Sequence, residues 1–299
     1  SRPDLRPLSV GEMVDGAIRL YRTHFTTLIK IAAVVLGPIA LIDVIATAAI
    51  GPVDMSTMLL VDPEANPMEV FEPLIPLYVV LTITSVLSFL GSTLVQGASI
   101  SVLAHSYRGE TIDWQTSLKT GARRLVPLVV ATVLISLGSG IGLVFCLVPG
   151  IYLFTMWSVT PAALVTERLG AIRAMGRSFD LVRGRFWPVL GALVLSYLLY
   201  IVVSQIIGGV ASAITVVSAL ASDQFSFLPS VIGSAIVQVV AAPFVASMVT
   251  IIYFDLRVRK EGYDLELMAR DLERMEGNDR RDLPPAGDDP FGLGSPGSR

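Results

Sequence analysis

Four long stretches of this chain contain no Asp, Glu, Lys or Arg, and they constrain its fold more than any other feature. These stretches lie between Glu72 and Arg108, Arg124 and Glu167, Arg185 and Asp223, and Asp223 and Asp255. Each is long enough to cross a bilayer, because a spanning helix needs about 20 mostly apolar residues. The sequence therefore predicts an all-α polytopic membrane protein.

Six transmembrane helices, arranged as three hairpins, are predicted from these stretches and from an apolar segment near the N-terminus. Four of them run from about Phe25 to Ile50, Pro76 to Ala104, Trp187 to Val217 and Leu228 to Phe254. The apolar block 125–165 is about twice as long, as a helix, as the hydrocarbon layer is thick. It must fold back on itself, and Pro149-Gly150 is the predicted turn. The third and fourth helices then form a tight hairpin.

All 22 Lys and Arg residues fall on one side of this six-helix threading. The connections on the other side contain none, and the first of them, 51–73, is acidic. Because cytoplasmic loops collect Lys and Arg, both termini are expected in the cytoplasm and the protein in the plasma membrane. The predicted parts are a cytoplasmic segment 1–24, a membrane domain 25–256 and a cytoplasmic tail 257–299, disordered from about 277.

A basic amphipathic helix is predicted before each hairpin, so the chain reads as three repeats of one unit. Segment 18–25 resembles 179–186, and 114–127 is a weaker copy. Such helices lie in the cytoplasmic interface, or they are ordinary helices packed on the bundle. In the first case the last helix brings arginines to the level of the lipid headgroups. The candidate headgroup contacts are Arg173, Arg177, Arg183 and Arg185.

A few polar residues lie inside the predicted transmembrane helices. Asp43 is the strongest functional candidate among these, because a carboxylate within the membrane is energetically costly and commonly functional. It carries a proton or balances a charge, or else it lies near the outer interface and touches water. Gln96, Gln205 and Gln238 are amides in the middle of helices. They bond across helices or line a polar path.

Composition argues against several functional classes. A net charge of −3 gives no reason to expect nucleic-acid binding. One cysteine, Cys146, allows neither an internal disulfide nor a cysteine metal cage. The two histidines, His24 and His105, lie at the ends of predicted helices, and no hydrolase or nucleotide-binding motif occurs. We expect a protein that is not an enzyme and has no cofactor.

One set of residues resembles a known family. The set comprises Pro149-Gly150-Ile151-Tyr152, Trp157, Pro161-Ala162, Glu167, Gly170, Ser178, Leu181-Val182, Gly184 and Phe186-Trp187. It is similar to the membrane domain associated with bacterial glycerophosphoryl diester phosphodiesterases and to the related YciC-like membrane proteins. The resemblance implies a six-helix membrane domain, in some members fused to a phosphodiesterase barrel. This chain lacks the barrel and its His-Arg and Glu-x-Asp pairs, so the activity is not carried over.

The shared positions have structural interpretations. Pro149-Gly150 turns the hairpin, and Pro161 bends the fourth transmembrane helix. Trp157 lies inside that helix, where it packs or donates a hydrogen bond. Glu167 ends the helix at the cytoplasmic face. A salt bridge from Glu167 to the basic helix that follows would fix the angle between them.

The favoured function is a non-enzymatic membrane module that organises lipids or partners at the cytoplasmic face. Its expected partners are membrane lipids, with a membrane protein or a second copy of the chain as further alternatives. A transporter for a small molecule or lipid is the second hypothesis, suggested by the repeats and by Asp43. The third is an enzyme of glycerophosphodiester metabolism.

Overall fold

A computed structural model describes residues 9–50, 74–110, 112–220 and 226–262 of the chain, and within these ranges it contains helices and no strand. The helices are α1 (Val10–Thr23), α2 (Phe25–Ile50), α5 (Ile75–Tyr107), α6 (Trp114–Arg123), α7 (Leu125–Phe145), α8 (Leu147–Met156), α9 (Thr160–Thr166), α10 (Ala171–Val182), α11 (Phe186–Leu220) and α12 (Leu228–Glu261).

The predicted all-α polytopic class is confirmed. Six segments of the described chain are helical, long and apolar enough to cross a membrane, namely α2, α5, α7, α8 with α9, α11 and α12. The chain is thus a multi-pass membrane protein by the length and composition of its helices. The last helix continues to Glu261, beyond its predicted end at Phe254. The predicted disordered tail and the acidic connection 51–73 lie outside the described residues.

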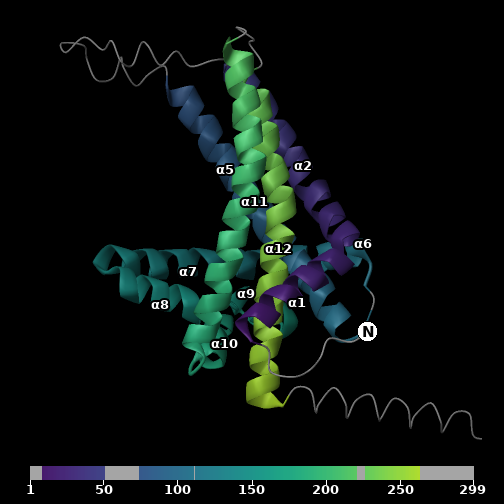
Figure 1. The fold of residues 1–299 in the computed structure, drawn as a ribbon, viewed down its shortest axis with the longest axis vertical. Coiled ribbons are helices and arrows are strands. Elements are labelled where there is room, and N and C mark those ends of the chain that lie inside the picture. The colour runs from purple at the N-terminus through teal and green to yellow at the C-terminus, as the bar shows by residue number, and fades with distance from the viewer. Residues whose placement is uncertain (1–8, 51–73, 111, 221–225, 263–299) are drawn as a thin grey trace, which may run out of the picture.

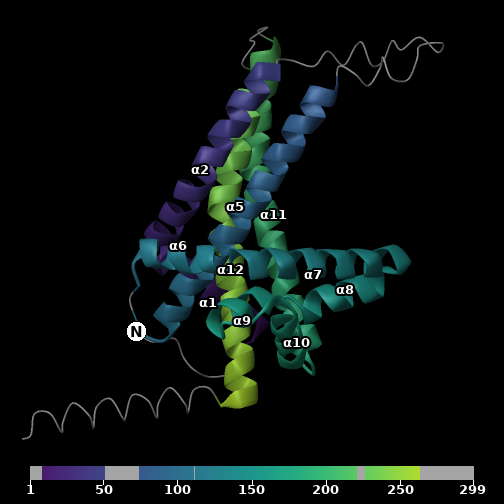
Figure 2. The same ribbon diagram turned by 180° about the vertical axis from the view of Figure 1, so that it is seen from behind.

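Four long helices, α2, α5, α11 and α12, extend roughly along the long axis of the molecule and form a bundle (Figure 1). In chain direction, α2 and α11 run opposite to α5 and α12. We call the end at which α2 and α11 begin, and α5 and α12 finish, the basic end. The hairpin of α7 and α8 does not follow this axis. It projects sideways from the bundle near the basic end, across the long helices, and the view from behind shows the same arrangement (Figure 2).

Three short amphipathic helices, α1, α6 and α10, gather at the basic end (Figures 1 and 2). Each directly precedes a pair of apolar segments, as the predicted repeat requires. The apolar segments that follow them begin at Phe25, Leu125 and Phe186. Helix α1 is capped as its sequence indicates, because Ser9 and Glu12 form a reciprocal capping box. The repeat of one amphipathic helix and two apolar segments is therefore present in the structure.

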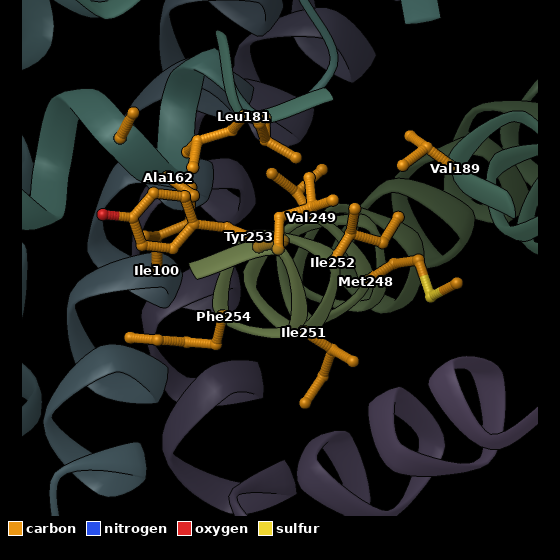
Figure 3. Packing of buried hydrophobic residues seen from close by; sticks show 14 of the residues in the cluster. Ile100, Ala162, Leu181, Val189, Met248, Val249, Ile251, Ile252, Tyr253 and Phe254 are labelled. Carbon is orange, nitrogen blue, oxygen red and sulfur yellow. The ribbon is translucent and has the colours of Figure 1, made fainter. Parts of the chain in front are cut away.

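The hydrophobic core surrounds the half of α12 nearer the basic end. Every residue of α12 from Ala246 to Leu256 is buried. The ring of Tyr253 extends from α12 toward Ala162 and Ile100 in the densest part of this cluster (Figure 3). The other half of α12 is mostly open, since Ile232 and Ile236 are exposed. The protein packs tightly at one end, and the rest of the bundle presents apolar surface.

The turn of the α7–α8 hairpin corrects one prediction. The chain reverses at Cys146, whose backbone is extended, and Pro149 and Gly150 lie inside α8. Proline is tolerated in the first turn of a helix, where its missing N–H leaves no bond unmade. Gly150 serves the packing of the hairpin, since it faces Gly142 so closely that a Cβ on Gly142 would lie 2.9 Å from the Gly150 Cα.

Candidate functional site

Polar side chains from three helices meet at the basic end, around the carboxylate of Glu167. Glu167 caps the C-terminus of α9. Arg177 of α10 donates from Nε to both oxygens of Glu167, at 2.9 and 3.1 Å. The hydroxyl of Tyr253 on α12 donates to Glu167 Oε1 at 2.7 Å. The predicted salt bridge between Glu167 and the following basic helix is therefore present, with Arg177 as its partner.

The contacts continue along α12, and we call the five residues Glu167, Arg177, Tyr253, Arg257 and Glu261 the ionic network. Arg177 Nη2 also pairs with Glu261, and Arg257 Nε donates to the other oxygen of Glu261 at 2.9 Å. Burial by itself lowers the pKa of Arg177, but its bonds to the two glutamates outweigh this and hold the pKa above the ordinary value. The guanidinium stays charged, and it is clamped between two carboxylates.

Two further charged residues of α12, Lys260 and Asp255, form polar contacts at the same end. Lys260 donates from Nζ to the carbonyls of Asp180 and Arg183, the latter at 2.6 Å, where α10 finishes. A lysine at the C-terminus of a helix satisfies carbonyls that lack a partner in the helix. The carboxylate of Asp255 is almost completely buried and accepts a bond from Arg259 Nε at 2.8 Å. The contacts of Lys260 hold the end of α10 against α12, and the pair of Asp255 and Arg259 lies within α12.

Sequence reasoning identified Glu167 but not its partners on α12. A usable signal was present, because Tyr253, Arg257 and Glu261 are four residues apart and therefore lie on one face of a helix. The last transmembrane helix is predicted to end at about Phe254, which places Arg257 and Glu261 in the tail. A helix that continues through these charged residues would place Tyr253, Arg257 and Glu261 on one polar face.

Asp43 and Gln238, two of the predicted polar residues, line the same small cavity. Asp43 comes from α2 and Gln238 from α12, and Ser88 and Ser234 line the cavity as well. The cavity holds about 20 Å³, which is enough for about one water molecule. A larger space of about 420 Å³ between α2 and α12 is lined entirely by apolar residues, among them Phe25 and Leu41.

The other predicted residues lie apart from this cavity. Gln205 is exposed on α11, and Gln96 is half-buried on α5. Trp157 follows α8, and its ring lies against α7, where a Cβ on Gly138 would come within 2.7 Å of it. Trp157 therefore packs within the hairpin, as predicted. Pro161 opens α9 after a break in the helix, which agrees with the predicted bend.

The candidate headgroup arginines divide into two groups. Arg173 and Arg183 are exposed at the basic end, and Arg185 is partly exposed. Arg177 belongs to the ionic network. Helix α10 buries Ala174, Ser178 and Leu181 against the protein and leaves Ile172 77% exposed. It is thus packed on the bundle by one face and open on another, which combines features of both interpretations of the sequence.

The two histidines are in hydrogen-bonding positions near the basic end. His24 Nε2 lies 2.7 Å from the Ser106 hydroxyl, and His105 Nδ1 lies 2.7 Å from the Ser101 carbonyl. Burial lowers the pKa of His24. Among the described residues, no three side chains of His, Cys, Asp or Glu are grouped as metal ligands would be.

Comparison with known proteins adds one family match. Residues 135–254 match the model of a domain of unknown function, DUF7847, which covers less than half of the chain. The matched segment begins within α7 and includes Glu167, Arg177 and Tyr253. No curated protein and no solved structure matches the chain. The resemblance to the membrane domain of glycerophosphoryl diester phosphodiesterases stays a prediction.

Proposed function

We propose that this protein is a non-enzymatic membrane module whose basic end holds anionic lipids, or a partner protein, at the cytoplasmic face. The observation that carries this proposal is the gathering of α1, α6 and α10 at one end of the bundle, where the ionic network joins α10 to α9 and α12. The two cavities are lined from the other half of α12, and they are apolar or hold about one water molecule.

Exposed arginines supply the binding chemistry. Arg22 on α1, Arg123 on α6 and Arg173 on α10 are all exposed, so each amphipathic helix brings positive charge to the same end. Basic residues near an anionic membrane surface contribute about 1 kcal/mol each. The ionic network neutralises Arg177 internally and fixes α10, so Arg173 and Arg183 are presented from a rigid support.

The test is lipid selectivity. The protein is reconstituted with a mixture of phosphatidylglycerol and phosphatidylcholine, and bound lipids are counted by native mass spectrometry. Replacing both Arg173 and Arg183 with Gln should reduce the enrichment of phosphatidylglycerol several-fold. The matched control replaces both with Lys, which keeps the charge and should keep the enrichment. Equal enrichment in the wild type and in the double Gln variant would contradict lipid binding at these arginines.

A partner protein is the other occupant that this function includes. Purification in a mild detergent should then recover one defined companion in constant ratio. The double Gln variant should lose that companion, whereas the double Lys variant should retain it. A protein that purifies alone, and that also shows no lipid preference, would overturn the proposed function.

A permease is the second candidate, and the meeting of Asp43, Ser88, Ser234 and Gln238 around one cavity favours it. Ionisable groups within membrane helices mark ion or proton paths in transporters. Flux of protons and small amphiphiles into proteoliposomes is the measurement. Asp43→Asn should abolish any flux, and Gln205→Ala, which changes an amide outside the cavity, should leave it unchanged. Flux that is absent, or equal in both variants, would remove this candidate.

A further inference from the structure

We propose that the α7–α8 hairpin is an arm that lies within one leaflet of the membrane, on the side of the basic end, and is surrounded there by lipid acyl chains. By length and composition, both α7 and the segment formed by α8 and α9 could cross a membrane. In the structure, however, the hairpin projects across the direction of the four long helices (Figures 1 and 2). When those helices cross the membrane, the arm lies along its plane.

The tip of the arm has the chemistry of hydrocarbon, not of a membrane surface. Val144 and Phe145 are 86% and 85% exposed, and Leu147 and Val148 are 65% and 72% exposed. A hairpin that crossed the membrane would place these four side chains in headgroups or water. The other two connections on that side contain acidic residues, such as Asp62 and Asp223, and so are suited to water. The tip of the middle hairpin contains no charged residue.

The backbone at the tip is also suited to an apolar setting. Each unpaired N–H or C=O group in hydrocarbon costs several kcal/mol, which limits where a chain can reverse. Here the reversal takes a single residue, Cys146, and its N–H donates to the Gly142 carbonyl at 3.0 Å. Pro149 has no N–H, so the first turn of α8 has one unpaired donor fewer. A reversal of one residue therefore leaves fewer unpaired backbone groups than a longer loop would.

The arm cannot rest half in water like an amphipathic helix. Such a helix keeps a polar face toward water and an apolar face toward lipid. On α7, the face that is not packed against the protein is lined by apolar side chains, including Val133, Leu137, Ile141 and Val144. There is no charged side chain between Arg124 and Glu167 that could form a polar face. The arm is therefore expected below the headgroups, in contact with lipid on its open sides.

Aromatic residues set the level of the arm. Tyr152 of α8 lies against Phe186 at the start of α11, with the ring centroids 5.4 Å apart. Trp187, the next residue, is 76% exposed. Tryptophan and tyrosine concentrate where the membrane meets water, so this cluster marks the boundary of the hydrocarbon at the basic end. The base of the arm carries Arg124 and Arg168, which contact each other through an Arg124 Nη1 bond to the Arg168 carbonyl at 3.3 Å.

An in-plane arm keeps the charge pattern intact. A hairpin returns the chain to the side from which it left, whether or not it crosses the membrane. All Lys and Arg residues then remain on one side, as the sequence requires. Charge counting therefore does not distinguish the two arrangements, and the depth of the tip does. The inference concerns the position of the arm in lipid and does not depend on the proposed function.

The native protein carries its own probe, because Cys146 is its one cysteine and is exposed at the tip. In proteoliposomes of known orientation, a membrane-impermeant maleimide should fail to label Cys146 from either side. Two single-cysteine controls in a Cys146→Ser background show that each side is reachable. Leu220→Cys should be labelled on the outer side and Ile172→Cys on the side of the basic end, since both positions are highly exposed.

A positive measurement of depth completes the test. Cys146 is labelled in detergent with a nitroxide, and the protein is then reconstituted. Oxygen, which concentrates in hydrocarbon, should relax the nitroxide strongly, and a water-soluble nickel chelate should not. Labelling of Cys146 from the outer side, or nickel access from that side, would show a spanning hairpin and overturn the proposal. Access from the side of the basic end would place the arm in water and overturn it as well.

The direction of α7 gives an independent readout. Val126 and Val144 lie near its two ends and are 72% and 86% exposed. Cysteine at either position, in the Cys146→Ser background, carries a fluorophore that brominated lipids quench according to depth. An arm in the plane places both probes at similar depth. A spanning helix would separate them by about 27 Å, at 1.5 Å per residue. A difference of that size would overturn the proposal.

Discussion

The middle hairpin and the two hairpins on either side of it in the chain begin with the same pattern and pack differently. In each case a basic amphipathic helix precedes two apolar segments. The first and third hairpins assemble into one bundle around α12. The middle hairpin packs on this bundle near its base, through α9, the start of α7 and α8, and its tip lies away from the bundle (Figure 1).

The difference lies in what each hairpin offers to its neighbours. Helices α5 and α12 bring long series of small and medium buried residues to the basic end, and they share the core with α9. The middle hairpin uses its small residues internally, since Gly142 faces Gly150 and Gly138 faces the ring of Trp157. Little is left with which to pack against the bundle. A repeated pattern of hydrophobicity thus fixes where helices form, and the distribution of small residues decides which of them assemble.

The largest effect should come from truncating the core, and it should be confined to the bundle. Ile252 is fully buried in α12, so Ile252→Ala leaves a cavity and should lower the free energy of unfolding by about 2–5 kcal/mol. The matched change in the arm is Ile141→Ala, at a side chain that is 58% exposed. Thermal unfolding in a mild detergent compares them. Equal losses would show that the arm is packed as tightly as the bundle.

The next effect tests the joint between the two regions. Glu167 terminates the middle hairpin, whereas its partners Arg177 and Tyr253 belong to the third repeat. Glu167→Gln removes a charged acceptor from partly buried donors and should lower the free energy of unfolding by about 1.5–3 kcal/mol. Glu110→Gln is the control, because Glu110 is exposed and 4.0 Å from its cationic neighbours.

A double-mutant cycle of Glu167→Gln with Arg177→Gln then isolates the pair. A coupling free energy near zero would mean that the ionic network does not hold the middle hairpin to the third repeat. Glu110→Gln should change the stability by well under about 1 kcal/mol, as exposed pairs do.

The positions of the helices could be predicted from the distribution of charge along the chain. The turn of the middle hairpin and its direction could not, because they depend on three-dimensional packing. Absence of charge located five of the six apolar helices, because charged residues are expelled from lipid; the first contains Lys30 and Asp43 and was located by its hydrophobicity. The turn at Cys146 was missed because Pro149 fits the first turn of a helix as well as it fits a loop. The direction of the middle hairpin was not predictable, since hydrophobicity along a chain has no orientation in space.

The candidate site shows the same division. The salt bridge of Glu167 followed from local order along the chain, because the basic helix comes directly after it. The meeting of Asp43 with Gln238 depends on how α2 and α12 are rotated about their axes, and nothing in either segment specifies this. Both residues were recognised as unusual, but their proximity required the structure.

A third prediction tests the internal packing of the arm. Gly142→Ala would bring a Cβ within 2.9 Å of Gly150 Cα, so the two helices must separate. We expect a loss of about 1–3 kcal/mol, as for other overpacked sites. Gly140→Ala, at a position with nothing within 4 Å, should be neutral or stabilising by up to about 1 kcal/mol. Urea or detergent denaturation measures both, and similar results for the two variants would contradict the close contact.

The smallest expected effect is a pH dependence of stability, and it should differ between the residues that join each amphipathic helix to its hairpin. The first repeat has His24 between its amphipathic helix and α2, whereas the middle repeat has Arg124 between α6 and α7. Burial lowers the pKa of His24 in the folded protein, so His24 is neutral there while the unfolded chain takes up a proton below its ordinary pKa of about 6.5. Stability should therefore fall as the pH decreases from about 6.5 toward the lower folded pKa, and it should level off below that. His24→Gln removes the titrating group but keeps a side chain that can bond to the Ser106 hydroxyl. The measurement is the free energy of unfolding as a function of pH between pH 7 and pH 5. If its slope is the same in the wild type and the variant, His24 is not the source of the slope, and the junctions of the first and middle repeats behave alike.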